Sequence, residues 1–258
     1  MDLPLAIDEC WDALLTDLDA IATPEWSLPT PCPEWNVRDL AAHLGAAQAS
    51  FQGMPLPSPP ADWVNPFTGL DAMTNAGVEA RRSWTTEQIV DEIREASARQ
   101  RAQIASLDEA GWSADTMGPI GPTTQAGLTR LRVFDLFVHL MDLRHALGRP
   151  LAPEATPEAA AVAAGWAVDH SGWGAGKKAH LPDGTRVRLA LSGPGATTVD
   201  VIVSGGRGAC VDPEGDTDEI VSGSAVAYLL LTTGREDAAG AAGGVQATGP
   251  HAQRLLDT

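Results

Sequence analysis

The chain has 258 residues, which is enough for two domains with separate cores. Apolar residues make up 44% of it and charged residues 20%, as in globular proteins, and no apolar run is long enough to span a bilayer. The formal charge of −17 repels phosphate backbones and anionic bilayers, so nucleic acid and membranes are excluded as partners.

The N-terminal residues and the cysteines indicate a cytoplasmic protein. No basic cluster precedes an apolar stretch near Met1, so we expect no export or mitochondrial signal. Cys10, Cys32 and Cys210 are far apart and form no CxxC motif. They predict neither a disulfide framework nor a thiolate metal site, and they fit a reducing compartment.

Helical periodicity dominates the first half of the chain. Apolar residues at steps of three and four predict a helix over residues 5–21, and four prolines in residues 23–34 predict an extended connection. Asn36 is a candidate N-cap, with Asp39 as its reciprocal partner, for a helix that continues to residue 51.

A long loop and three more helices are expected before the middle of the chain. Residues 52–68 are rich in proline and predict a loop, followed by a helix over residues 70–84. Thr85 and Gln88 form a capping box for a helix over residues 85–107. After an irregular stretch, residues 125–147 form a helix that Gly148 and Pro150 end.

The pattern changes after Pro150, so we predict a boundary near Arg149 between domains of residues 1–149 and 150–258. The second domain is expected to be α+β, with helices over residues 157–170, 224–232 and 251–256. Alternating residues predict strands over 185–191 and 198–204. The glycine-rich stretches 171–176 and 240–244 are interpreted as loops.

Polar residues interrupt the apolar face of the helix at residues 125–147. Asp135, His139 and Asp142 stand at spacings of four and three and so share one side of it. Burying such groups is costly unless they bind one another, water or a metal. Asp135 and His139 could both reach a divalent ion. A third ligand from a neighbouring helix, for which His43 is the candidate, would complete a metal site with open positions. The spacing by itself also fits a simple hydrogen-bonded pair.

Two motifs carry a resemblance to a known family. The segment PCPEWNVRDLAAHL at residues 31–44, together with DLFVHLMDL at 135–143, resembles the mycothiol-dependent maleylpyruvate isomerase family of the DinB-like superfamily. The resemblance implies an N-terminal DinB-like four-helix bundle and a smaller C-terminal α+β domain of sterol-carrier-like fold. It also implies metal ligands at His43, Asp135 and His139, zinc or another divalent metal, and mycothiol as a cofactor.

The resemblance continues around residues 221–235, and it implies a functional arginine at Arg235. A guanidinium there could bind a carboxylate of the substrate or cofactor, whereas the alternative role is to cap the preceding helix. Asp142 is expected to support a ligand or contact the substrate. Asp142 and Arg235 are therefore the candidate catalytic residues, and Arg235 is also the candidate cofactor-binding residue.

Other polar residues receive simpler interpretations. His145 faces another side of its helix and is expected to be solvated or interfacial. His170, His180 and His251 have no partner visible in the sequence and are interpreted as surface residues. Cys32 is interpreted as a small packed residue rather than a reactive thiol. Trp35 is expected to anchor the core or a loop.

The leading hypothesis is an enzyme in which a metal-activated thiolate adds to an electrophilic small molecule. Rotation and loss of the thiol would make it a cis-trans isomerase, and retention of the thiol would make it an S-transferase. One alternative is a metal-dependent enzyme of secondary metabolism that uses no thiol. Another is a non-catalytic protein that binds small ligands.

Overall fold

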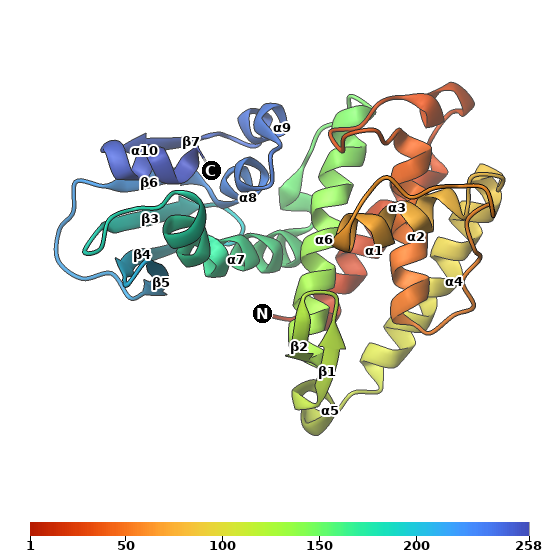
Figure 1. Ribbon diagram of the computed structural model, residues 1–258, viewed down its shortest axis with the longest axis horizontal. Helices are drawn as coiled ribbons and strands as arrows, with labels where there is room; N and C mark the ends of the chain where they lie inside the picture. The colour runs from red at the N-terminus through yellow and green to blue at the C-terminus, as the bar shows by residue number, and fades with distance from the viewer. Residues whose placement is uncertain (258) are drawn as a thin grey trace. The chain divides into compact units, whose positions relative to one another are not determined.

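The computed structural model describes residues 1–257 and divides into two compact units (Figure 1). The helical unit comprises Ile7–Thr129 and His139–Pro150, and the sheet unit comprises Met1–Ala6, Arg130–Val138 and the chain from Leu151 onward. The predicted fold class, a DinB-like helical part followed by an α+β part, is confirmed. The units do not divide the chain at a single point, and the domain boundary near Arg149 stays a prediction.

The long helices of the first half match the predicted ones: they are α1 (Leu3–Asp19), α2 (Val37–Phe51), α4 (Thr86–Ala105) and α6 (Gln125–Ala146). A shorter helix, α3 (Gly69–Glu79), packs with α4 against α2. Helices α1 and α4 meet in the core, where the Nε1 of the fully buried Trp11 donates to Oε1 of Gln100 at 2.6 Å. This pairing satisfies the indole N–H that burial takes away from water.

Side-chain caps start helices α2 and α4. The side chain of Asn36 accepts from the backbone N–H of Asp39 at 2.9 Å, and Thr85 and Gln88 cap each other's backbone as predicted. Asp39 was expected to return the bond to Asn36. Its carboxylate accepts instead from Nη1 of Arg82 at 2.6 Å, because a charged donor lies within reach.

Three stretches of the helical unit differ from the sequence predictions. The proline-rich connection, predicted to be extended, contains the 3₁₀ helix η1 (Thr23–Ser27), whose first turn Pro24 favours. Helix α3 ends at Glu79, five residues before its predicted end. The stretch predicted to be irregular folds into α5 (Glu109–Ser113) and a hairpin of β1 (Asp115–Gly118) and β2 (Gly121–Thr124).

The sheet unit contains a five-stranded mixed sheet with the order β5-β4-β3-β6-β7. Its strands are β3 (Arg186–Ser192), β4 (Thr197–Ser204), β5 (Arg207–Val211), β6 (Ile220–Ser224) and β7 (Val245–Thr248). β3 pairs parallel with β6, and the other neighbours are antiparallel. Strands β3 and β4 were predicted. The other three were not, since each has only four or five residues and little apolar alternation.

Helices complete the sheet unit: η2 (Pro153–Ala155), α7 (Pro157–Trp173), α8 (Ala225–Thr232), α9 (Glu236–Ala241) and α10 (Pro250–Leu256). α7 packs against β4 and β5, α8 against α7 and β6, and α10 against β6 and β7. The predicted loop at residues 240–244 is in part the end of α9.

The predicted loop at residues 171–176 is wrong, because these residues form the end of α7 and the π-helical turn η3 (Gly174–Lys178). The glycines there serve close packing instead. A Cβ on Gly172 would lie 2.5 Å from the carbonyl oxygen of Gly208 on β5, so only glycine lets the helix approach this strand.

Across the described residues, none of the helices combines the length and the apolar character that a membrane crossing requires.

Candidate metal centre

Helices α2 and α6 position the predicted ligands. His43 lies on the second turn of α2 and is 5% exposed, and His139 lies in the middle of α6 and is 8% exposed. Their rings meet edge to face, with centroids 4.9 Å apart. Asp135 stands one turn before His139 on α6. Two buried imidazoles from different helices thus lie next to each other, and their role as metal ligands stays a prediction.

The nitrogen and carboxylate ligand atoms of His43, Asp135 and His139 all lie within 4.8 Å of one another. The described residues contain a second such group, formed by Cys32, His139 and Asp142. Two imidazoles and one carboxylate are a donor set typical of a catalytic zinc ion that keeps an open coordination position. The residues present therefore fit the metal that the resemblance implies, and these three side chains would hold it without a protein thiolate.

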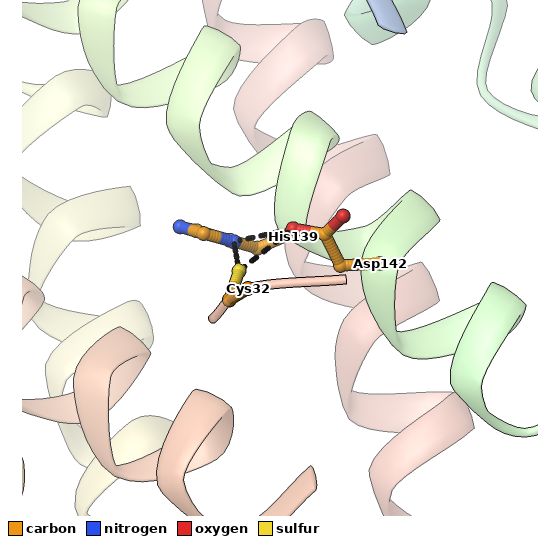
Figure 2. Close-up of side chains that lie close together, drawn as sticks. All are labelled: Cys32, His139 and Asp142. Carbon is orange, nitrogen blue, oxygen red and sulfur yellow. Dashed lines mark hydrogen bonds and ion pairs between the residues drawn. The ribbon is translucent and has the colours of Figure 1, made fainter. Parts of the chain in front are cut away.

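Asp142 orients the imidazole of His139. Its Oδ2 contacts Nδ1 of His139 (Figure 2) at a distance of 3.0 Å. Asp142 is fully buried. Because Nδ1 engages the carboxylate, the opposite nitrogen, Nε2, is the one available to a metal. Metal-binding histidines commonly donate their second ring N–H to a carboxylate in this way. Asp142 thus has the geometry of a residue that supports a ligand, and that role stays a prediction.

Cys32 lies beside this pair, which the sequence analysis did not foresee. Its Sγ is 3.2 Å from Oδ2 of Asp142 and 3.8 Å from Nδ1 of His139. Cys32 is buried, as the interpretation of a small packed residue expects, and its thiol also contacts the polar groups of the site. Spacing gave no signal of this, since more than a hundred residues separate Cys32 from His139.

Local hydrogen bonds hold the connection that carries Cys32. The hydroxyl of Thr30 donates to the carbonyl of Trp35 at 2.8 Å, and the N–H of Trp35 donates to the carbonyl of Cys32 at 3.2 Å. Glu34 completes the turn with a φ of 68°, which is uncommon for a residue other than glycine. The turn is thereby held in a form that directs the Cys32 thiol toward α6.

Trp35 forms an aromatic wall next to both histidines. Its ring centroid lies 4.9 Å from that of His43 and 6.4 Å from that of His139. The indole Nε1 donates to Oδ1 of Asn75 on α3 at 3.1 Å, which fixes the ring. Trp35 was interpreted as an anchor, and it also borders the candidate metal centre.

Arg132 supports the carboxylate of Asp135. Its Nη1 lies 2.7 Å from Oδ2 of Asp135, and its side chain is only 4% exposed. A carboxylate has a second oxygen for a metal, so the ion pair is compatible with ligation and fixes the orientation of Asp135. The i, i+3 spacing of a basic and an acidic residue on one helix was a signal for this contact that the sequence analysis overlooked.

The remaining histidines lie away from the centre. His145 and His180 are exposed, as expected of surface residues. His170 is likewise exposed, as expected, and the side chain of His251 is 38% exposed, but both have partners that the sequence did not reveal. The ring of His170 stacks on Trp166 with centroids 4.5 Å apart, and Nδ1 of His251 lies 3.0 Å from Oε1 of Glu219, whose other oxygen accepts from the first N–H groups of α10.

Arg235 lines a pocket of about 1160 Å³ in the sheet unit. Side chains of both charges and several amides and hydroxyls share this pocket, among them Lys178, Thr233, Gln246 and Gln253. The guanidinium also donates to the carbonyl of Thr233 at the end of α8. The helix-capping contact is thus present, and the same side chain is exposed to a space large enough for a small molecule.

The fold and the centre together define a DinB-like helical protein with a candidate metal site and an appended α+β unit. Residues 7–144 match the family profile described as the mycothiol maleylpyruvate isomerase N-terminal domain. Because the match covers more than half of the chain, the chain belongs to this family.

Solved structures agree with this assignment at the level of the fold. Two crystal structures of the mycothiol-dependent maleylpyruvate isomerase, one of them of a histidine-to-alanine mutant, match with a TM-score of 0.61 each. The mutant is 15% and the other 16% identical to this chain, and the matches cover 96% of this chain and 93% of those chains. No curated relative matches the sequence.

Proposed function

We propose that this protein is a metal-dependent and mycothiol-dependent enzyme that adds a thiolate to an electrophilic small molecule. The reaction is the cis-to-trans isomerisation of maleylpyruvate or a related compound, or the transfer of the thiol to the electrophile. Membership of the family supports this proposal. The observation that carries it is the group of His43, Asp135 and His139, whose ligand atoms lie within 4.8 Å of one another.

The donor set explains why a metal would serve this chemistry. A free thiol has a pKa of about 8.5 and is mostly protonated at neutral pH. A zinc ion held there would lower the pKa of a bound thiol and yield a thiolate that remains nucleophilic. Three protein ligands leave a position for that thiol.

The surrounding side chains prepare the ligands. Asp142 holds the proton of His139 on Nδ1, so that Nε2 carries the lone pair for the ion. Arg132 fixes the carboxylate of Asp135, and Trp35 covers the His43 ring. The reacting groups would therefore lie in a partly dry setting, in which electrostatic interactions are stronger than in water.

Addition and elimination account for the isomerisation. The thiolate forms a C–S bond to one alkene carbon while the π electrons move onto the conjugated carbonyl, which leaves a single C–C bond that rotates. The reverse electron flow expels the thiolate and restores the double bond as the trans isomer. Arg235 is a candidate to bind a substrate or cofactor carboxylate in a bidentate way.

Turnover assays with the full zinc-loaded chain test the proposal. We expect maleylpyruvate to convert to its trans isomer only when mycothiol is present, or a stable mycothiol thioether to accumulate. His145→Ala serves as the control and should retain the activity. Conversion that needs the metal but no thiol would favour the thiol-independent enzyme, and tight ligand binding without any turnover would favour a binding protein.

A further inference from the structure

Three potential metal ligands of different softness lie together at the Nδ1 side of His139. The Cys32 thiol, the Asp142 carboxylate and Nδ1 of His139 are 8%, 0% and 8% exposed as residues. The donor atoms lie 3.0, 3.2 and 3.8 Å apart, and Figure 2 shows Cys32 and Asp142 on the same side of the imidazole. Nothing in the reaction proposed above uses the thiol of Cys32.

We propose that Cys32, Asp142 and Nδ1 of His139 form a second metal position that takes a thiophilic divalent ion in competition with the first. The spacing of the donors supports this. A tetrahedral ion with metal–sulfur bonds of about 2.3 Å and metal–nitrogen or metal–oxygen bonds of about 2.0 Å separates its donors by roughly 3.3–3.6 Å. The observed distances need to change by only a few tenths of an ångström to match.

The type and charge of the donors select the ion. A thiolate is a soft ligand and favours zinc or cadmium over magnesium or calcium. Together the thiolate and the carboxylate carry two negative charges, which balance a divalent ion in a buried setting and so avoid the cost of an unpaired charge.

The two positions exclude each other because they share one imidazole. Binding at the second position releases the Cys32 proton to solvent and moves the ring proton of His139 from Nδ1 to Nε2. Nε2 then has no lone pair for an ion held by His43 and Asp135. The chain therefore binds one ion at either position, and a strongly thiophilic ion blocks the position assigned to catalysis.

Cadmium titration of the metal-free full chain tests the proposal, in the absence of added thiols. We expect one equivalent of Cd²⁺ to produce a near-ultraviolet thiolate-to-cadmium charge-transfer band. Cys32→Ser should abolish the band and weaken Cd²⁺ binding by roughly 100-fold or more, since an outer residue that only supports a ligand typically accounts for about 10–100-fold. Cys210→Ser is the matched control and should keep both the charge-transfer band and the affinity for Cd²⁺. Serine is nearly isosteric with cysteine and can still donate to Asp142, so the fold is expected to survive.

A second variant separates this inference from the proposed function. The double replacement His43→Ala and Asp135→Ala removes two ligands of the first position only, and it should leave the cadmium–thiolate band intact. His139→Ala removes a ligand of both positions and should abolish the band. Absence of the band in the unaltered protein, its persistence in Cys32→Ser, or its loss in the double variant would overturn the second position, whatever the turnover assays give.

Discussion

His139 contacts both a candidate metal ligand, His43, and the carboxylate of Asp142. Nδ1 lies 3.0 Å from the carboxylate of the fully buried Asp142, and the rings of His139 and His43 meet edge to face. A neutral imidazole has only one N–H, so a proton on Nδ1 assigns the lone pair to Nε2. The carboxylate therefore determines which nitrogen can bind a metal.

The first prediction concerns Asp142→Asn. An amide can still accept from Nδ1–H of His139, so we expect about one ion per chain to remain while turnover falls by about 10–100-fold, as is typical when a supporting carboxylate is lost. Elemental analysis after dialysis and steady-state kinetics measure the two effects. A loss of metal equal to that in His139→Ala would instead identify Asp142 as a direct ligand.

The second prediction concerns Arg235→Lys in the sheet unit. Lysine keeps the charge but cannot bind a carboxylate in the planar, bidentate way of a guanidinium. We expect unchanged metal content, a free energy of unfolding within about 1 kcal/mol of the unaltered protein, and a kcat/KM lower by roughly tenfold or more.

Denaturant unfolding and steady-state kinetics separate the two roles of Arg235. If the free energy of unfolding falls while the kinetics of the folded protein stay unchanged, Arg235 only caps α8 through the carbonyl of Thr233 and does not bind substrate or cofactor.

At the scale of elements, Tyr228 reports the packing of α8 on α7. Its hydroxyl lies 2.7 Å from Oγ of Ser171 on α7, and burial raises the pKa of Tyr228 to about 12. It is the one tyrosine in the sequence, so tyrosinate absorption reports this side chain alone.

The third prediction is therefore a spectrophotometric titration with a pKa near 12 in the folded chain and near the ordinary value of 10.0 in denaturant. A folded pKa above the unfolded one means that the contribution to stability is complete below pH 10.0 and is lost as the pH rises toward 12. A folded chain that titrates near 10 would show that the phenol is hydrated and the α7–α8 contact is open.

Ser171→Ala supplies the control for this titration. The Ser171 hydroxyl lowers the pKa of Tyr228 through its hydrogen bond, so its removal is expected to raise the pKa further.

Elements with strong local signals were the ones that the sequence could predict. The caps at Asn36 and Thr85 and the apolar periodicity of α1, α4 and α6 depend on neighbours within a few residues. The hairpin β1–β2 and the strands β5, β6 and β7 depend on partners distant in sequence. The glycines at 172 and 208 show the limit clearly: they look like loop residues, yet they allow a helix and a strand to approach each other.

The same distinction applies to the site. The spacing of Asp135, His139 and Asp142 on one helix predicted a polar face and a partner from a neighbouring helix, and the family resemblance supported His43 as that partner. The places of Cys32 and Trp35 in the site were not predicted, because the connection that contains them reaches α6 and α2 only through tertiary folding. Their contacts with His139 and His43 could not be inferred from local sequence.

For the whole molecule, the proposed function depends on two separate groups of residues. His43 on α2 and Asp135 and His139 on α6 form the first metal position, whereas Arg235 lines a pocket formed by residues between Lys178 and Asp257. Substitution of Arg235 should therefore lower kcat/KM without changing the metal content. Substitution of a metal ligand should lower both.

Elemental analysis of the purified full chain tests the central claim, that His43, Asp135 and His139 hold a divalent ion. In a Cys32→Ser background, which removes the second position, we predict about one ion per chain. His145→Ala should keep it, and alanine at any of the three ligands should reduce it to a small fraction. A stoichiometric ion that survives replacement of all three ligands would contradict the account.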